Sequence, residues 1–328
     1  MPPSRDSETT RDALVREAIT HAEATAGRDD AAFLRAFYAH FDAGNRKATR
    51  QLRTIRAVPV ARAAAPSDSF HIYQDPRYLK NARELARRTM GGTRIIGGSA
   101  VKAGDFLDCV AVGSDAQWGC TGTLIGPNVV VTAGHCADFA TRVYFGIDVT
   151  QPGRIVRVKK RVRHPKYHQA GKHNDLMVLL LESDVTNVAP RGLASGPLID
   201  KATDGRVVGF GATEPSGNFG YGRKQQVDVP IASNACKAKV DGHDDNVSYG
   251  CDRSLELVAG RPLLQRDTCN GDSGGPFYVT GPDGGRLLGA ATSRATDSAV
   301  SNCGDGGIYV RIDRYRSWIA GIPGVRLA

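Results

Sequence analysis

The chain has 328 residues, of which 41% are hydrophobic and 23% charged, a composition typical of globular proteins. That length is enough for roughly two domains of about 150 residues each. No apolar run approaches the roughly 20 residues that a membrane-spanning helix requires. Glycine is abundant, with 38 residues, and aromatic residues make up 7%, which favours a turn-rich β fold over a helical bundle. No zinc-ligand spacing, phosphate-binding loop or aromatic nucleic-acid motif occurs, so we expect no metal, no cofactor and no nucleic-acid partner.

The first 94 residues differ from the rest of the chain. They hold 17 Lys and Arg against 11 Asp and Glu, a net charge of +6, whereas the remaining residues carry only +3. A basic segment of this kind can bind acidic polymers, but a solvated Arg-rich linker is the simpler interpretation. Apolar periodicity predicts helices over 11–25, 30–41 and 78–90, so we expect residues 1–94 to form a small α-helical segment.

From Ile95 onward the pattern changes to short β-like runs separated by Gly, Pro, Asn and Asp. This spacing of strands and turns predicts a β-sandwich or barrel. A helix over 313–320, with Tyr315, Trp318 and Ile319 on one face, is expected to close the chain. The predicted strands are 109–112, 123–125, 129–132, 142–145, 155–162, 176–181, 207–210, 276–279, 287–292 and 307–312.

All seven cysteines follow residue 100, and none forms a Cys-x-x-Cys pair. Six of them can form three disulfides, which favours a secreted or periplasmic location. Residues 1–20 are polar and charged, however, and lack the apolar core of a secretory signal. Either the true start lies upstream, or export uses another route, or the protein stays in the cytoplasm, and all three readings stay open.

Ser273 lies in the run Cys-Asn-Gly-Asp-Ser-Gly-Gly-Pro at 269–276. Serine becomes an effective nucleophile when a base takes its proton and a third group holds that base in the right tautomer. His135 follows an apolar run directly, and Asp175 precedes another. These three residues are therefore the candidate nucleophile, base and orienting carboxylate. The histidines at 164, 168 and 173 also lie close together, and we interpret them as a solvated loop in preference to a metal site.

The run around Ser273 also fits the Gly-x-Ser-x-Gly elbow of α/β-hydrolases. In that fold the catalytic histidine follows the serine in the chain. None of the eight histidines of this sequence follows Ser273, so the elbow interpretation lacks a base and is dropped.

Four separated motifs resemble those of the chymotrypsin/trypsin family of serine proteases, whose catalytic order is His, Asp, Ser. Their spacings fit as well: 40 residues separate Ile95 from His135, 40 more lead to Asp175, and 98 more lead to Ser273. The resemblance covers Ile95 to about Ile322. It implies a mainly β fold of two packed six-stranded antiparallel β-barrels with a C-terminal helix, preceded by the small α-helical N-terminal segment. The motifs are Arg-Ile-Ile-Gly-Gly at 94–98, Thr-Ala-Gly-His-Cys at 132–136, Asn-Asp-Leu at 174–176 and Asp-Ser-Gly-Gly-Pro at 272–276.

The resemblance implies a trypsin-like serine endopeptidase that acts on protein or peptide substrates. Ser273 would attack the scissile carbonyl, His135 would carry its proton, and Asp175 would orient His135. The backbone N–H groups of Gly271 and Ser273 would form the oxyanion hole.

The resemblance also implies activation by cleavage. Family precursors are cut before a motif like that at Ile95, and the new α-amino group pairs with the Asp that precedes the nucleophile, here Asp272. We therefore expect a precursor that is cut after Arg94, either by another protease or by itself.

Specificity is implied by Asp267, six residues before Ser273, where an Asp selects Arg or Lys in family members. Ser293 and Gly307 match residues of the substrate pocket. Arg294 departs from the pattern because it puts a positive charge where a cationic substrate is expected. Ala295, at the position of a glycine, narrows the pocket entrance slightly.

The disulfides are matched by the same resemblance. Cys120–Cys136 would fasten the histidine loop, and Cys269–Cys303 would brace the pocket. Cys236–Cys251 is the remaining expected pair, although it departs from the family, where the second cysteine stands at the position of Val258. Cys109 has no clear partner.

Two interpretations of the N-terminal segment stay open. Residues 1–94 are an inhibitory pro-region of a 95–328 catalytic domain, or they are an adaptor that recruits an intracellular signalling or defence protease to a partner. A catalytically inactive binding protein is disfavoured because all three candidate catalytic residues are present.

Overall fold

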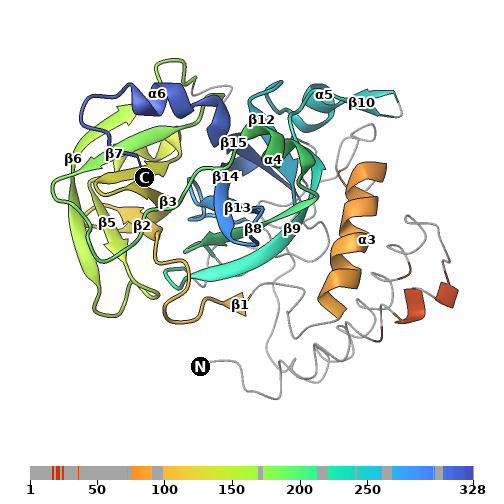
Figure 1. Cartoon of the computed structure of the whole chain (residues 1–328), viewed down its shortest axis with the longest axis horizontal. Helices are drawn as coiled ribbons and strands as arrows, with labels where there is room; N and C mark the ends of the chain where they lie inside the picture. The colour runs from red at the N-terminus through yellow and green to blue at the C-terminus, as the bar shows by residue number, and fades with distance from the viewer. Residues whose placement is uncertain are drawn as a thin grey trace, which may run out of the picture.

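The structure is a computed structural model that describes residues 75–90, 99–168, 173–212, 221–240, 242–260, 268–297 and 306–327, with isolated positions that include Ile72. Two β-barrels lie side by side, and one helix flanks the second of them (Figure 1). The expected mainly β, two-barrel fold with a C-terminal helix is confirmed. The helices predicted over 11–25 and 30–41 lie almost wholly outside the described residues. No described helix is long and apolar enough to cross a bilayer.

The first barrel is closed by six antiparallel strands in the order β2-β3-β4-β7-β6-β5. The apolar run after Asp175 is buried on both faces because the strand alternates between two cores. Met177 and Leu179 fill the barrel, whereas Val178 and Leu180 pack outward toward the second barrel. The strands are β2 (Cys109–Gly113), β3 (Trp118–Gly126), β4 (Val129–Thr132), β5 (Arg142–Phe145), β6 (Arg154–Arg163) and β7 (Met177–Leu181).

The second barrel contains β8 (Asp204–Gly209), β9 (Gln225–Ser233), β12 (Glu256–Ala259), β13 (Pro276–Thr280), β14 (Arg286–Ala295) and β15 (Gly307–Arg311). Its order is β8-β9-β12-β15-β14-β13, and pairing of β13 with β8 closes it. A short strand, β1 (Ser99–Ala100), adds to β9, and β10 (Lys239–Val240) pairs with β11 (His243–Asp244) in a separate hairpin.

Short helices occupy the connections. These are the 3-10 turn η2 (Gly134–Asp138) after β4, α4 (Gly196–Lys201) before β8, and α5 (Asp245–Tyr249) before β12. The predicted closing helix is split into a 3-10 turn, η3 (Ile312–Arg314), and α6 (Arg316–Ala320). Its predicted apolar face is retained, since Tyr315 and Ile319 are buried in the core shared by the two barrels and Trp318 packs against that core.

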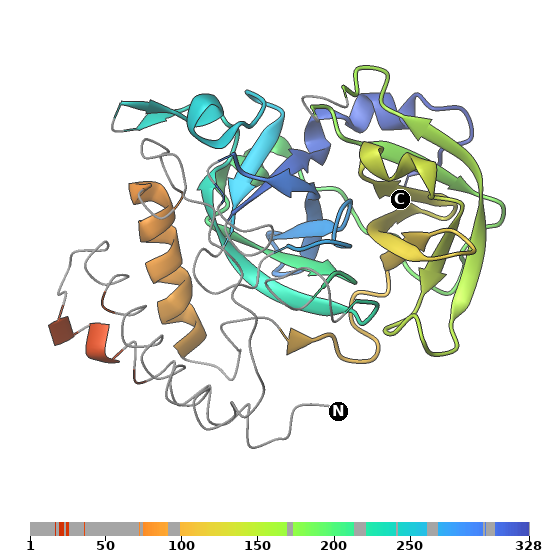
Figure 2. The ribbon, with the colours of Figure 1, turned by 180° about the vertical axis from the view of Figure 1, so that it is seen from behind.

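Helix α3 (Pro76–Met90) starts two residues before the predicted helix. Asp75 caps it by accepting a hydrogen bond from the N–H of Arg77 at 2.9 Å, and Pro76 takes the first helical position, where no N–H partner is needed. Both views place α3 against the second barrel on the side that faces away from the first (Figures 1 and 2).

A buried polar network joins the barrels. Asp108, directly before β2, accepts a hydrogen bond from Tyr278 of β13 at 2.7 Å. Arg191, in the connection between the barrels, donates to the same carboxylate through two nitrogens, one of them at 3.0 Å. Asp108 is almost completely buried, so its charge depends on these partners.

Replacement of Arg191 by Met is expected to lower the free energy of unfolding by about 3 kcal/mol, because it leaves a buried carboxylate without its cation. Urea denaturation measures the loss. Arg157→Met is the matched control, since Arg157 is exposed and only 3.9 Å from an exposed partner, Asp115; its effect should stay within about 0.5 kcal/mol. Equal effects of the two substitutions would show that the network contributes little.

Candidate active site

His135 and Asp175 meet because their strands are neighbours. β4 and β7 pair antiparallel with Thr132 opposite Met177, so the end of β4 and the start of β7 lie at the same edge of the first barrel. The N–H of His135 donates to Asp175 Oδ1 at 2.9 Å, and His135 Nδ1 lies 2.7 Å from Oδ2. The carboxylate therefore fixes both the backbone and the ring of His135.

Asp175 is fully buried, and a third donor reaches it from the second barrel. The Ser293 hydroxyl on β14 donates to Asp175 Oδ2 at 2.7 Å. Burial opposes ionisation of Asp175, but the hydrogen bonds from His135 and Ser293 outweigh it and hold the pKa of this carboxyl below its usual value. Sequence reasoning assigned Ser293 to the pocket alone and missed this contact, because no local signal links residues 118 positions apart.

Ser273 lies in a turn of the second barrel that is attached to the first. Its carbonyl accepts the N–H of Thr121 on β3 at 2.9 Å, and the Thr121 hydroxyl donates to the carbonyl of Gly271 at 2.8 Å. Cys136 Sγ, next to His135 in the chain, lies 3.9 Å from the Ser273 carbonyl. Within the described part of the chain, the Ser273 hydroxyl makes no hydrogen bond with His135. Such contacts are often long in a free enzyme and shorten when substrate binds.

The glycines around Ser273 have structural reasons of their own. Gly271 and Gly274 have φ of 95° and 78°, a region that L-residues rarely adopt. A side chain on Gly274 would also collide with the first barrel, because its Cβ would lie 2.1 Å from Thr132 Oγ1. We expected these glycines to admit a substrate carbonyl; for Gly274 the observed need is close contact between the barrels.

The amide groups of this turn are divided between internal bonds and open positions. The N–H groups of Asp272, Gly274 and Gly275 donate to carbonyls at 2.7–3.0 Å. Those of Gly271 and Ser273 donate to no atom among the residues that the structure describes. The two amides expected to bind an oxyanion are thus the two that the protein does not use itself.

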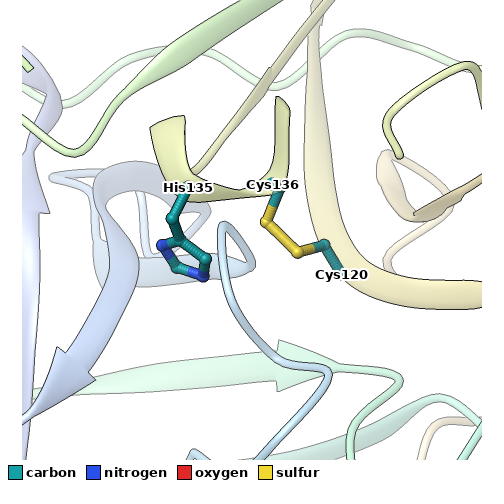
Figure 3. Close-up of side chains that lie close together, drawn as sticks. All are labelled: Cys120, His135 and Cys136. Carbon is teal, nitrogen blue, oxygen red and sulfur yellow. A yellow bond between two sulfur atoms is a disulfide. The ribbon is translucent and has the colours of Figure 1, made fainter. Parts of the chain in front are cut away.

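A disulfide between Cys120 and Cys136 fastens the histidine turn to β3 (Figure 3). These two cysteines and His135 are close enough together to suggest a metal site, but their sulfurs are bonded to each other and cannot bind as thiolates.

The other cysteines fall into three groups. Cys236 and Cys251 form a second disulfide. Cys269 is also disulfide-bonded, and its expected partner, Cys303, lies outside the described residues. Cys109 is a buried free thiol, whose pKa burial raises to about 12, so it is unreactive.

The expected pocket residues are only partly within the described chain. Gly307 starts β15 and pairs with Ala295 at the end of β14, two residues beyond Ser293. Asp267 lies outside the described residues.

Our concern about Arg294 is corrected by its surroundings. Its guanidinium donates to both oxygens of Glu256, at 2.8 and 2.9 Å, and to the carbonyl of Gly250 at 2.8 Å. Glu256 is fully buried, so the two charges neutralise each other inside the barrel. Arg294 therefore does not present a free positive charge to a substrate.

Asp272 is partly buried and turned into the second barrel. Its carboxylate accepts the N–H groups of Gly211 at 2.8 Å and Cys269 at 3.0 Å. Burial nevertheless raises the pKa of Asp272 to about 6, against the effect of these two donors. Arg94 and Ile95 lie outside the described residues.

The histidines expected in a solvated loop are more ordered than that interpretation allows. The ring of His164 packs edge-on against Tyr315 and Trp318, with centroids 5.0 and 4.7 Å away. Burial lowers the pKa of His164. His168 and His173 pair across a short bridge, and His173 Nδ1 lies 3.9 Å from an Asp252 carboxylate oxygen. His164 thus serves packing against the closing helix.

Comparison with known proteins gives the same assignment. The family model for trypsin matches residues 95–319. A trypsin from Saccharopolyspora erythraea is 32% identical over 231 residues, which cover 67% of this chain and 94% of that protein. Kallikrein-7 of Homo sapiens is 29% identical over 74% of this chain and 92% of its own length. Serine proteinase stubble of Drosophila melanogaster is 30% identical over 69% of this chain, but this is only 31% of that larger protein. The chain belongs to the trypsin family of serine endopeptidases.

Proposed function

We propose that the protein cleaves peptide bonds after Arg or Lys with Ser273 as nucleophile, and that it is made as a precursor activated by a cut after Arg94. The observation that carries the proposal is the buried carboxylate of Asp175, which holds His135 Nδ1 at 2.7 Å beside the turn of Ser273. A base fixed in one tautomer next to a serine is the requirement for acyl transfer.

Hydrolysis would then take place in two halves. In the first, Ser273 Oγ attacks the substrate carbonyl as its proton passes to Nε2 of His135, which then protonates the leaving amine. An ester to Ser273 remains. In the second half, a water molecule gives a proton to His135 and attacks this ester, and Ser273 is released. Asp175 accepts the Nδ1–H bond throughout and stabilises the positive imidazolium.

The oxyanion of both tetrahedral intermediates would be bound by the N–H groups of Gly271 and Ser273. Support comes from their lack of partners among the described residues, while the neighbouring amides are already paired. A preorganised donor of this kind typically contributes about 10²–10³-fold to kcat.

The preference for Arg or Lys is assigned to Asp267, with Ser293 and Gly307 as pocket residues. An ionised carboxylate in an enclosed pocket selects a cationic side chain because either charge alone would be costly to bury. The pairing of Arg294 with Glu256 supports this assignment, since it removes a nearby cation that would repel such a substrate.

Activation is assigned to Asp272. In the uncut chain its carboxylate has two N–H donors but no cation among the causes that set its pKa, and the pKa is raised. A new ammonium group at Ile95 would complete its surroundings and fix the turn of Ser273. We therefore divide the chain into an N-terminal segment, 1–94, and a catalytic domain, 95–328. A cut after Arg94 also matches the proposed specificity, which permits self-activation.

The catalytic assignment is tested with peptides that differ only in the residue before the scissile bond. The cut enzyme should hydrolyse the Arg and Lys members, and Ser273→Ala should lower kcat/KM by at least about 10³-fold and abolish labelling by a serine-directed covalent probe. Ser317→Ala, at an exposed position of α6, is the control and should keep full activity. Cleavage only after large apolar residues would refute the assigned role of Asp267 but not that of Ser273.

The activation site is tested with Arg94→Gln. The variant should remain uncut and unlabelled by the probe, because Asp272 lacks its cation, whereas Lys102→Gln, which removes an exposed basic residue nearby, should be activated like the unchanged chain. Mass spectrometry of the N-terminus and probe labelling measure the two properties. Full labelling of uncut Arg94→Gln would disprove activation by this cut.

The Asp272 assignment also predicts a pH dependence. Because the pKa is raised to about 6, ionisation destabilises the uncut fold, and this cost grows as pH rises through that value. The ammonium group of the cut chain stabilises the same carboxylate. In the Ser273→Ala background, the Tm of the cut chain minus that of the uncut chain should therefore increase from pH 5 to pH 7.5. The increase should vanish when Asp272→Asn is added; a difference that persists unchanged in that background would contradict the pairing.

A further inference from the structure

Helix α3 is attached to the second barrel through a buried cluster of charges. Arg77 Nη2 lies 2.6 Å from Asp75 on its own segment and 2.6 Å from Asp245 on the second barrel. Its other nitrogens add bonds of 3.0 Å to Asp75 and 3.2 Å to Asp245. Both carboxylates are almost completely inaccessible to solvent, so one guanidinium holds two buried anions.

The remaining oxygen positions of this cluster are also satisfied. Tyr249 of α5 donates to Asp75 at 2.8 Å, and Ser233 of β9 donates to Asp245 at 2.6 Å, as does the N–H of Ala238 at 3.0 Å. Burial alone would lower the pKa of Arg77, but the hydrogen bonds from its side chain to the two carboxylates raise it, so the guanidinium stays charged. Loss of either side of the cluster would leave an uncompensated buried charge.

Further contacts follow the same face of α3. Asn81, one turn after Arg77, donates to the carbonyl of Ile231 on β9 at 2.9 Å. Arg88, two turns further, pairs with Asp204 on β8. Tyr78, Leu79 and Leu85 are buried along the helix. The helix is therefore anchored at its start, middle and end, and none of these contacts involves the residues around Arg94.

The same segment reaches the strands that carry the proposed pocket. Ile72 is fully buried, and a Cβ built on Gly306, directly before β15, would lie 3.4 Å from its side chain. The carbonyl of Tyr249 accepts the N–H of Asp297, just beyond β14, at 3.0 Å. Contacts thus lead from Ile72 and Asp75 to the end of β14 and the start of β15, where Ser293 and Gly307 lie.

We propose that Ile72 and residues 75–90, here called the docking segment, remain bound to the second barrel after the chain is cut before Ile95 and brace the β14–β15 wall of the substrate pocket. The mature enzyme would then consist of two non-covalently associated chains. The bracing rests on the proposed function, because it concerns the pocket; the retention does not, because the contacts exist whichever protease makes the cut.

Retention is tested on the full chain with Ser273→Ala and with residues 91–94 replaced by the recognition sequence of an added site-specific protease that cuts before Ile95. After complete cutting, the N-terminal fragment should co-elute with the catalytic domain in size-exclusion chromatography. Arg77→Ala should release it, and Asn81→Ala, which strands no buried charge, should weaken the complex at least threefold on dilution. Lys80→Ala removes an exposed charge from the same helix and should have no effect.

Separation of the fragment from a folded catalytic domain in the otherwise unchanged sequence would overturn the proposal. This result would leave activation at Arg94 untouched. Conversely, a cut chain that stays associated but never becomes active would count against the proposed function while supporting retention.

Bracing is tested with Ser273 intact, on chains cut by the same added protease. Asn81→Ala and Arg77→Ala should raise KM for an Arg-containing peptide severalfold and change kcat less, because the pocket wall rather than the triad is loosened. Lys80→Ala should leave both values unchanged. Unaltered KM after release of the fragment would refute the bracing.

Discussion

The site depends on one buried charge, the carboxylate of Asp175. It is fully enclosed, and a carboxylate in that position is stable only when donors surround it. Two donors come from His135 in the first barrel and one from Ser293 in the second. The need to satisfy this group therefore orients the histidine ring and at the same time fixes β14 of the second barrel against the first. Chemistry and barrel packing are served by the same hydrogen bonds.

The nucleophile turn is held to the first barrel in a comparable way. Thr121 binds the carbonyls of both Ser273 and Gly271, and its hydroxyl also accepts the N–H of Phe210 from the second barrel. The close approach of Gly274 to Thr132 leaves no room for a side chain between the barrels. The glycine-rich run thus combines a backbone shape that exposes two amides with an interface that tolerates no Cβ.

Three enclosed acidic groups of this protein differ in how well their charges are compensated, and the difference matches their proposed roles. Asp75 and Asp245 share Arg77 and have further hydroxyl donors, which suits a permanent attachment. Asp272 has two amide donors and a pKa raised to about 6, which suits a group that awaits a cation. A saturated cluster outside the cut and an unsaturated carboxylate beside Ser273 would let one cleavage change the catalytic turn without detaching the docking segment.

The sequence by itself determined the family, the two-barrel fold and the residues His135, Asp175 and Ser273, because motif order and spacing are local, readable properties. β4 and β5 were predicted with their observed ends, since apolar runs bounded by turn residues define them. β9 and β12 were missed: Pro230 and polar residues interrupt the first, and the second has four residues. Only the tertiary structure decided that Ser293 binds Asp175, that Glu256 neutralises Arg294, and that Arg77 anchors α3 to Asp245. Each of these contacts joins residues 38 to 168 positions apart, and their energy comes from burial of charge, which no local pattern encodes.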